Sequence, residues 1–440
     1  MENRHRFISF SAIASLALVA GACTNGDSSS PFTSNGRAAK ADRTPILSHE
    51  VAAVRQEGAP ISQGLAAAAL TEAPAGYDNL TNGFVTQAEL DTARGVFEEV
   101  ESIADGLGPV YNAQSCRECH QTPVTGAASQ ISEFRAGHFN GTSFVDHPGG
   151  SLINDRAINA AIQERILAGN EVRTFRISTN ILGDGFVEAI DSNTLLAISN
   201  GQPAGMRGQL IQVPVSEAPG NSRAGRFGWK NQQASLKSFA ADAYLNEMGI
   251  TSPLQPTENT SNGNSVAAFD TVADPEDDGE DIDFFVTFMR SSKAPPRDAV
   301  AAATTSARNG ATLFTAIGCA TCHVASINTA PAGTVINGGA FTVPAALGDK
   351  TIHPYSDFLL HDIQTGDGIV QNGGQSTRNK LRTPPLWGVR ARDRLMHDAA
   401  TVSRTDAINR HGNEASGVRA NFNSLSASQQ TDVINFLNSL

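Results

Sequence analysis

The chain contains the motif Cys-x-x-Cys-His twice, as SCRECH at residues 115–120 and as CATCH at residues 319–323. Cysteine is scarce elsewhere, because four of the five cysteines in the 440 residues belong to these motifs. This spacing is the attachment signature of a c-type haem, in which two thioether bonds hold the porphyrin and the adjacent histidine binds the iron. The sequence therefore predicts two covalent haems, and the fold must form a core around each.

Each motif supplies a complete set of attachment residues. The predicted haem-binding residues are Cys116, Cys119 and His120 at the first site, and Cys319, Cys322 and His323 at the second. A redox dithiol would need a βαβ context and no obligatory histidine. A structural zinc site could use two Cys-x-x-Cys pairs, but these pairs lie far apart along the chain. Two complete motifs, with no other cysteine after residue 23, favour haem.

The N-terminus has the pattern of a secretory signal. Residues 1–22 hold two arginines, the apolar run ISFSAIASLALVAGA and small residues before Cys23. The run is too short to cross a bilayer comfortably. Cys23 follows Ala-Gly-Ala and resembles the lipidated cysteine of a bacterial lipoprotein, and the alternative is an ordinary signal peptide cut near Ala22. We predict a protein of the periplasm or cell envelope that is anchored to a bacterial membrane only by its N-terminal lipid.

Composition shifts along the chain suggest its organisation. TNGDSSSPFTSNGRAAK is polar and cannot bury a core, so residues 23–80 are predicted to form a flexible tether and N-terminal extension. KAPPRDA marks a plausible boundary between a first domain over 81–295 and a second over 296–440. The net charge is −12, and the absence of a basic stripe with interleaved aromatics gives no reason to expect a nucleic-acid partner.

Helical signals flank both motifs. Thr86-Gln-Ala-Glu89 is a capping box, and apolar residues follow at helical spacing at 90, 93, 97, 100 and 103. Leu313, Phe314 and Ile317 form an apolar face before the second motif. A second capping box at Ser426-Ala-Ser-Gln429 begins a terminal helix that would cross the pre-motif helix. We therefore predict a mainly α fold of two cytochrome c-like domains, each with a covalent c-type haem, with long loop-rich insertions.

The acidic run DPEDDGED, residues 274–281, lies between the two halves. It is predicted to be a solvated loop or the entry to a helix. Calcium binding is the alternative function for such a cluster.

Several stretches resemble the di-haem oxidoreductase family, which is described as peroxidases or thiol oxidoreductases. They are GLGPVYNAQSCRECH, RAGRFGWKNQQASL, NEMGITSPLQP, IHPYSDFLLHDI, LRTPPLWGVR and LMHD…INRHGNEA, and they run from about residue 80 to the C-terminus. The resemblance implies two c-type domains with their haems facing a common interface. One departure is visible: the family's usual His-Asp-Gly is His397-Asp398-Ala399 here.

The sixth haem ligands would decide which haem reacts, because a filled iron favours electron transfer and an open one permits chemistry. The peroxidase relatives use a removable loop histidine after the first motif, and the resemblance implies His138 for this role. They supply the second-haem ligand from a late segment, which implies Met396. A solvent-facing histidine and a core methionine are the alternative interpretations.

Cleavage of a peroxide O–O bond needs a general acid–base. The relatives use a glutamate beyond the first motif, which implies a catalytic role for Glu188 in LGDGFVEAID. Burial among apolar neighbours would raise its pKa, although a buried glutamate can simply accept backbone hydrogen bonds. Trp229 is predicted to relay electrons between the haems, as a bridging tryptophan does in the relatives, or otherwise to be a core residue.

The leading hypothesis is an exported haem oxidoreductase of the cytochrome c peroxidase type. It would take electrons from a small redox protein or another donor, pass them through one haem to a reactive haem, and reduce peroxide or another small oxidant. A non-enzymatic di-haem electron carrier and a di-haem oxygenase remain as alternatives. The long stretch from about 140 to 290 favours an enzyme, because a carrier does not need it.

Overall fold

The computed structural model of the chain describes residues 69–440. The predicted signal peptide, Cys23 and the tether up to residue 68 lie outside these residues. The described end of the predicted extension contacts the rest of the chain, because β1 (Thr71–Glu72) pairs with β13 (Lys350–Ile352). No helix in the described part of the chain is long and apolar enough to cross a membrane.

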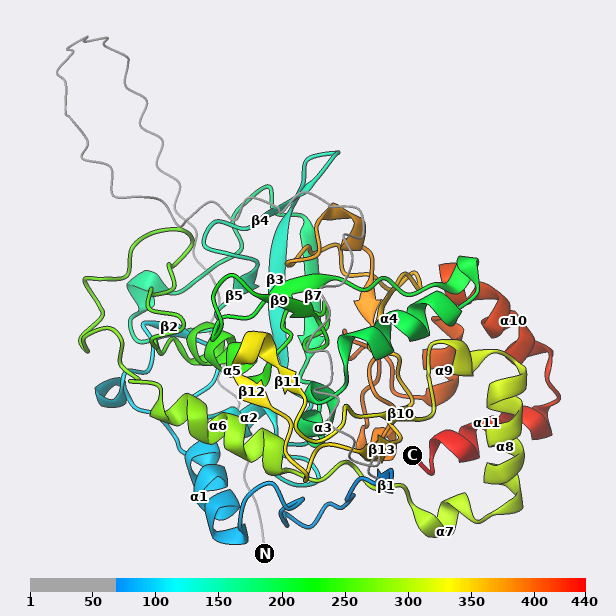
Figure 1. Ribbon diagram of the computed structural model, residues 1–440. Coiled ribbons are helices and arrows are strands. Elements are labelled where there is room, and N and C mark those ends of the chain that lie inside the picture. Colours follow the sequence, from blue (N-terminus) through cyan, green and yellow to red (C-terminus); the bar gives the residue numbers. More distant parts are fainter. Residues whose placement is uncertain (1–68) are drawn as a thin grey trace, which may run out of the picture. The chain divides into compact units, whose positions relative to one another are not determined.

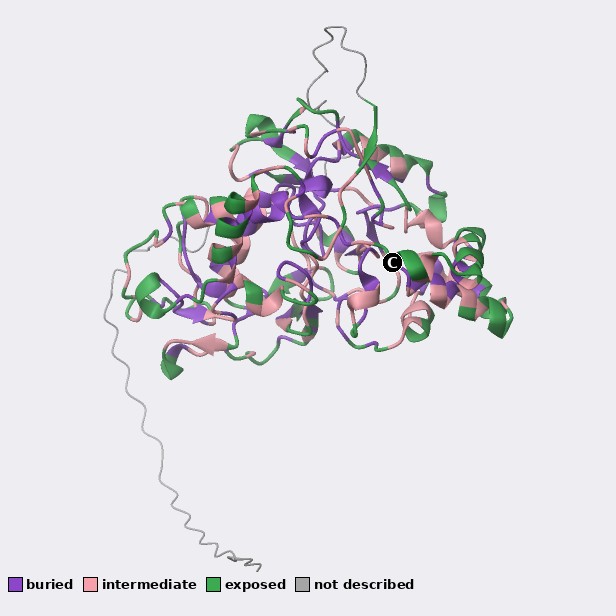
Figure 2. Ribbon diagram, turned by 90° about the horizontal axis from the view of Figure 1, so that it is seen from below, coloured by how far each residue is buried: buried purple, intermediate pink, exposed green. Residues whose placement is uncertain are grey.

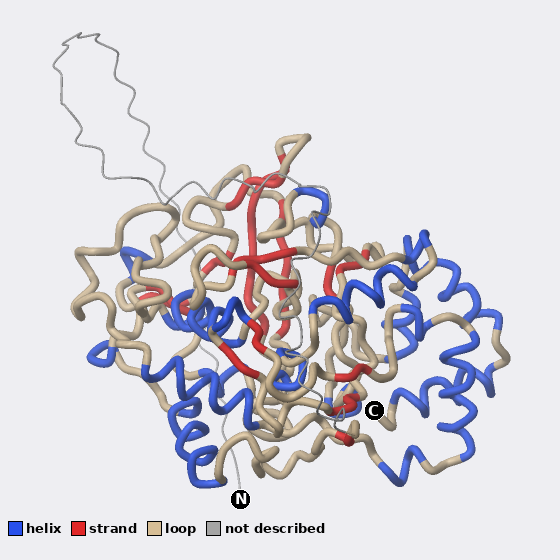
Figure 3. Tube along the Cα trace, in the orientation of Figure 1, coloured by secondary structure: helices blue, strands red, loops and turns tan. Residues whose placement is uncertain are grey.

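The prediction of a mainly α fold is wrong. Residues 69–440 contain 33% helix and 15% strand, with eleven α-helices. The α-helices are α1 Gln87–Glu98, α2 Cys116–Cys119, α3 Asp184–Glu188, α4 Ser192–Gly201, α5 Leu236–Ala243, α6 Glu280–Ser291, α7 Ala299–Ala302, α8 Thr305–Ala316, α9 Arg404–Asn409, α10 Ser416–Ser424 and α11 Ala427–Leu437. Figure 3 shows strands and long loops between the helices around α1 and those around α8. The boundary at 295/296 stays a prediction.

The largest sheet follows the first motif and was missed in the sequence. Its central strand β3 (Ser132–Phe139) pairs along one edge with β7 (Val172–Ile177) and along the other with β4 (Phe144–Asp146) and β5 (Leu152–Ile153), all antiparallel. The two long strands run side by side in Figure 1. Phe134 and Phe175 face each other across them, with ring centroids 4.8 Å apart. Such cross-strand pairs stabilise a sheet, but they join residues far apart in sequence.

Short strand pairs connect the remaining segments. They are β2 (Val110–Tyr111) with β6 (Arg156–Ala157), β8 (Gln212–Pro214) with β9 (Ser222–Ala224), β11 (Val335–Ile336) with β12 (Phe341–Thr342), β14 (Leu360–His361) with β15 (Leu381–Arg382), and β10 (Ile327–Asn328) with β13.

Helix α1 begins at the predicted capping box, which is confirmed. The Thr86 side chain accepts a hydrogen bond from the Glu89 amide, and the Glu89 carboxylate accepts one from the Thr86 amide. The helix ends at Glu98, so the predicted apolar face is too long. Val100 and Ile103 lie beyond the helix and are 64% and 46% exposed.

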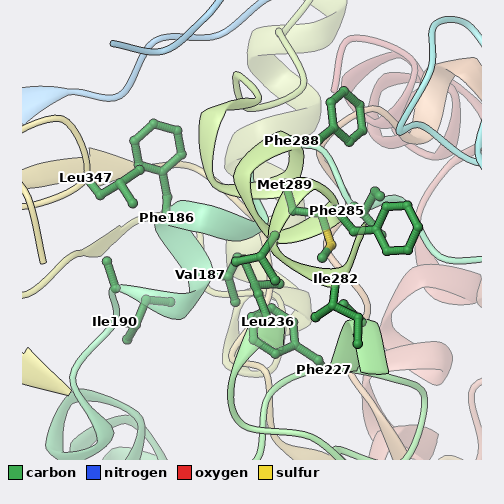
Figure 4. Packing of buried hydrophobic residues seen from close by; sticks show 14 of the residues in the cluster. Phe186, Val187, Ile190, Phe227, Leu236, Ile282, Phe285, Phe288, Met289 and Leu347 are labelled. Carbon is green, nitrogen blue, oxygen red and sulfur yellow. The ribbon is translucent and has the colours of Figure 1, made fainter. Parts of the chain in front are cut away.

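The two motif-flanking helices are each covered by a second helix. Helix α11 crosses α8, which confirms the prediction for the C-terminal helix. Gly310 permits this approach, because a side chain there would collide with the Asp432 carbonyl of α11. Helix α6 covers α1 in the same way and starts at the acidic run, as predicted for a helix entry. Figure 4 shows Phe285, Phe288 and Met289 of α6 packed into this core.

Charged side chains are also buried where the loops and strands meet. Figure 2 shows buried residues concentrated in this region, with exposed residues on the outer faces of the helices. Arg176, Glu188, Arg223, Arg226, Lys230, Asp357 and Asp367 are all at most 8% exposed. Buried charges require partners, and these partners define the surroundings of the two motifs.

Candidate functional site

The first motif forms the one-turn helix α2. The Ser115 hydroxyl caps it by accepting a hydrogen bond from the Glu118 amide at 3.3 Å. Cys116 and Cys119 are not in a disulfide. Burial raises the pKa of both thiols, that of Cys119 to about 12. Reactive dithiols need the opposite shift, so this pair is unsuited to thiol–disulfide exchange.

His120 is held in the protonation state that an iron ligand requires. Its Nδ1 lies 3.3 Å from the Ala127 carbonyl oxygen. Burial lowers the pKa of the imidazole to about 4, so the ring is neutral at neutral pH. The Phe97 ring from α1 packs against it at a centroid distance of 6.3 Å. Metal-binding histidines commonly donate their second ring N–H to a carbonyl in this way, which leaves Nε2 as the ligand atom.

The second motif repeats this arrangement. The Nδ1 of His323 lies 2.9 Å from the Tyr355 carbonyl oxygen, and burial lowers the pKa of the imidazole to about 4. Phe314 from α8 packs against the ring at 6.1 Å. Cys319 and Cys322 are free, and burial raises the pKa of both thiols. Both motifs therefore present two thiols, a neutral imidazole with a fixed Nδ1, and an apolar ring, and this set fits a c-type haem.

A small cavity of about 20 Å³ lies next to the first motif. Its wall includes Ala127, Trp229, Arg382, Trp387 and Arg392. The Trp387 Nε1 is buried with no hydrogen-bond partner among the described residues. Burial lowers the pKa of Arg382 and of Arg392 to about 10, as happens when a cation lacks enough compensating charge. These donors fit a group that carries carboxylates, as a haem does through its propionates.

Trp229 lies between the two motif regions. It lines this cavity together with Ala127, and its backbone carbonyl accepts a hydrogen bond from the Arg382 amide at 2.8 Å. Arg382 belongs to β15, which pairs with β14, and His361 of β14 lies 3.7 Å from the Cys322 sulfur. The Trp229 Nε1 donates to the Ile177 carbonyl at 2.9 Å. This position is compatible with both a relay and a buried core tryptophan.

Glu188 does not have the raised pKa that the sequence suggested. The residue is fully buried at the end of α3. Burial alone would raise its pKa, but Arg290, whose Nε lies 2.7 Å from the carboxylate, outweighs this effect and lowers it. The carboxylate also accepts from the Leu236 amide and the Asn337 side chain, each at 2.9 Å. This geometry favours a structural anion over a group that exchanges protons.

The two predicted sixth ligands are placed less favourably than the motif histidines. His138 lies near the end of β3 with its side chain 46% exposed, and its Nδ1 binds the Glu171 carboxylate at 2.7 Å. This arrangement fits a solvent-facing histidine. Met396 lies in a left-handed turn, with φ 67°. The histidine whose ring lies next to His323, in addition to the Phe314 ring, is His411, at a centroid distance of 6.4 Å.

The His-Asp-Ala departure does not abolish the turn. Ala399 adopts the left-handed backbone that glycine would favour, with φ 57°. Asp398 binds the Arg410 guanidinium with both carboxylate oxygens, at 2.9 and 2.5 Å. The turn therefore holds the residue that precedes His411.

His361 forms a buried charged cluster beside the second motif. Its Nε2 lies 2.8 Å from Asp357, and its Nδ1 lies 2.8 Å from Glu414. Burial would lower the pKa of this imidazole, but the hydrogen bonds to Asp357, Cys322 and Glu414 raise it to about 12. His361 is therefore a cation next to Cys322 and is not a neutral metal ligand.

A carboxyl pair near the first motif was missed in the sequence. Glu133 of β3 and Glu247 of the π-helical turn Tyr244–Met248 share a hydrogen bond. Burial and the neighbouring Glu133 raise the pKa of Glu247 to about 8, and the Glu247 charge raises the pKa of the Cys119 thiol. Two buried carboxyl groups that share one proton can store and release it near neutral pH.

A buried ion network continues from this pair toward Trp229. The Arg135 guanidinium binds Glu133, and Arg176 lies 3.8 Å from the same carboxylate. Arg176 also binds Asp367 at 2.7 Å, and Asp367 lies 3.2 Å from the Lys230 amine. Burial alone would raise the pKa of Asp367, but Arg176 and Lys230 lower it to about 2. Lys230 directly follows Trp229, so the network runs from the surroundings of Cys119 to those of Trp229.

The chain was compared with solved structures and curated proteins. Hydrazine synthase from Kuenenia stuttgartiensis is 14% identical with a TM-score of 0.34, over 87% of this chain and 100% of that chain. A MauG-like protein associated with microbial copper homeostasis is 14% identical with a TM-score of 0.38, over 85% of this chain and 93% of that chain. Likeness at these values supports no conclusion about activity. No curated protein matches.

A family model matches most of the described residues. The model "Di-haem oxidoreductase, putative peroxidase" covers residues 131–440, which include the second motif and the charged network. This match confirms the resemblance that the sequence shows. The protein belongs to the di-haem oxidoreductase family and is a di-haem redox enzyme.

Proposed function

We propose that the chain is an exported, peroxidase-like oxidoreductase with two covalently attached c-type haems. The observation that carries this proposal is the paired geometry of the motifs. Each holds two free thiols beside a neutral histidine whose Nδ1 lies by a backbone carbonyl, at 3.3 Å for His120 and 2.9 Å for His323. When bound, the haems supply irons that exchange single electrons, and an iron with an open coordination position can react with peroxide.

Trp229 and the strands next to it form the proposed route for electrons between the two motifs. Trp229 stands against the first motif's cavity and is hydrogen bonded through its backbone to β15, whose partner β14 carries His361 next to Cys322. An aromatic ring in this place supports the proposed electron relay. Its indole N–H is fixed on Ile177, which holds the ring in one orientation.

The proposed proton store is the Glu133–Glu247 pair. Reduction of hydrogen peroxide to water takes up two protons with two electrons, so a group that holds a proton at working pH is needed. Glu247 keeps its proton up to about pH 8, and the Asn112 side chain donates to its carboxyl group at 2.8 Å. The lowered pKa of Glu188 makes that residue a poorer candidate for the same role.

We predict that Glu247→Gln lowers kcat for peroxide reduction by about 100-fold, as expected for loss of a positioned acid–base group. In the wild type, activity should fall as pH rises through about 8, because Glu247 then loses its proton. This limb of the pH profile should vanish in the variant. Steady-state assays with a reduced small cytochrome as donor measure both effects.

The matched control is Glu99→Gln, which changes an exposed glutamate beside α1. It should keep the wild-type rate and pH profile. If Glu247→Gln retains the full rate and the same alkaline limb, the pair is not the proton store.

The proposed location is the periplasm or cell envelope, with Cys23 lipidated on a bacterial membrane. The signal pattern of residues 1–22 supports this proposal. Palmitate labelling of the full chain tests it, because Cys23→Ala should abolish incorporation. The partners that this location provides are a small redox protein as donor and peroxide as oxidant.

A pure electron carrier and an oxygenase are the other functions compatible with two haems. Peroxide consumption with a reduced donor, followed by oxygen-uptake measurements, distinguishes them. A peroxidase consumes peroxide in proportion to the donor oxidised. A carrier shows neither reaction, and an oxygenase consumes oxygen with an organic substrate.

Calcium binding by the acidic run stays a prediction. Carboxylate oxygens of Glu258, Asp274 and Glu276 lie within 4.8 Å of one another. Both oxygens of Glu258 are buried with no hydrogen-bond partner among the described residues, and burial next to Glu276 and Asp274 raises the pKa of Glu258 to about 9. A divalent cation would compensate this charge.

If calcium binds there, a 100-fold excess over Kd should stabilise the chain by about 2.7 kcal/mol relative to a chelator. Glu258→Gln should remove the increase, whereas the exposed Glu280→Gln should retain it. Thermal unfolding of the full chain with and without calcium measures the shift. Equal melting temperatures in the wild type would rule out this site.

A further inference from the structure

We infer that His411 is the axial ligand opposite His323 at the second haem, which makes this haem a six-coordinate, electron-transfer centre. The inference rests on the proposed function, because it presumes a haem at the second motif. His411 then takes the ligand role that the sequence predicted for Met396, and the first haem is the reactive one.

The two imidazoles have the spacing that one iron requires. Their ring centroids are 6.4 Å apart and their planes differ by 53°. Two imidazoles bound to one metal from opposite sides, each with a metal–nitrogen bond of about 2 Å, have centroids about 6 Å apart. Rings in direct contact also have centroids about 4.5–7 Å apart, so the inference rests on this spacing together with the hydrogen bonding of the two imidazoles.

In each of the two imidazoles, the Nδ1 atom lies next to a backbone carbonyl, which fixes the orientation of the ring. The Nδ1 of His411 lies 2.8 Å from the Ala407 carbonyl at the end of α9, as the Nδ1 of His323 lies 2.9 Å from the Tyr355 carbonyl. No hydrogen bond to Nε2 of either ring is found among residues 69–440. Each histidine therefore keeps Nε2 for a metal, as metal-binding histidines do when their Nδ1 donates to a backbone carbonyl.

Four contacts hold residues 410–414 in place. Asp398 binds the preceding Arg410, which also donates to the Thr401 hydroxyl at 2.8 Å. The Gly412 amide donates to the Ile363 carbonyl at 2.9 Å. Glu414 binds the His361 cation, and His361 contacts Cys322 of the motif itself. The ring thus reaches His323 through a segment fixed on both sides, as expected for a ligand that is already in position before the metal binds.

The first motif lacks such a partner. Within the described residues, the ring contact of His120 is with Phe97, and no second imidazole packs against it. The asymmetry between the two motifs gives each haem a role. The second haem is closed by two histidines and suits electron storage, whereas the first keeps a coordination position for the oxidant.

The test is the electron paramagnetic resonance spectrum of the purified full chain, with haem content measured on the same sample. The ferric wild type should show one low-spin haem with two imidazole ligands. His411→Gly should convert this signal to high spin while two haems per chain remain, and added imidazole should restore it. His411→Met should give a low-spin haem with the distinct near-infrared band of a thioether ligand.

The control is His353→Gln, an exposed histidine that binds Glu72, and it should leave the spectrum unchanged. An unaltered low-spin signal in His411→Gly overturns the inference. If the variants fail to fold, near-infrared magnetic circular dichroism of the wild type replaces them as the test. A band typical of a methionine ligand, or the absence of a haem with two imidazole ligands, would also overturn the inference. Absence of covalent haem in the wild type would refute the proposed function instead, so the two failures are distinguishable.

Discussion

Glu188→Gln is expected to destabilise the fold by about 3 kcal/mol and to leave turnover per haem unchanged. The substitution removes the charge that compensates Arg290, whose side chain is only 13% exposed. It also weakens the contacts to Leu236 and Asn337, which tie α3 to two distant segments. Urea unfolding monitored by circular dichroism measures the stability, and peroxide assays at low temperature measure the turnover.

A second variant separates charge from packing. Glu188→Gln combined with Arg290→Met removes both charges and should recover most of the lost stability, because the cation that the single variant leaves unpaired is then also absent. A single variant that is as stable as the wild type but has lost turnover would contradict the structural role and support Glu188 as the general acid–base.

Asp367→Asn should have a comparably large effect, a loss of about 3–5 kcal/mol, because it leaves the buried Lys230 without its anion and the buried Arg176 with only the more distant Glu133 carboxylate. Asp367, Arg176 and Lys230 have side chains that are at most 1% exposed, and the ion pairs measure 2.7 and 3.2 Å. The free energy of unfolding of the full chain, from urea titration at neutral pH, measures the loss.

The contribution of Asp367 can also be measured from the way the free energy of unfolding changes with pH. The pKa of Asp367 falls to about 2 in the folded chain, below its usual value of about 4 in an unfolded chain. A lowered carboxyl pKa stabilises the fold above about pH 4, and this stabilisation is lost as the pH falls toward 2. Asp367→Asn should lose that part of the acid transition, whereas the exposed Asp155→Asn should keep it. Identical acid profiles for the three proteins would show that the network contributes no stability.

Local signals made the motif regions predictable. The capping boxes at Thr86 and Ser426 and the apolar spacing before CATCH each lie within a few residues, and the structure has a helix at each place. The motif histidines follow the cysteines directly, so the sequence alone places them beside the thiols. The sheet was missed because β3 is stabilised by β7 and β5, and the pairing partners cannot be identified from the strand's own residues.

Contacts between residues far apart in the sequence explain why the site differs from the sequence-based predictions. The pKa of Glu188 depends on Arg290, which no spacing rule connects to it, so burial alone predicted the wrong direction. Glu133 and Glu247 belong to a strand and to a π-helical turn far along the chain. No spacing in the sequence links His411 to His323, and only the fold brings the two rings together.

The central claim is that both Cys-x-x-Cys-His motifs attach haem covalently. Intact-protein mass spectrometry of the denatured full chain, produced in a bacterium that assembles c-type cytochromes, tests it most directly. We expect the mass of the mature chain plus two haems, with one haem fewer in Cys116→Ala/Cys119→Ala and one fewer in Cys319→Ala/Cys322→Ala. A wild-type chain with no bound haem, or variants that keep both haems, would show that the motifs do not attach haem.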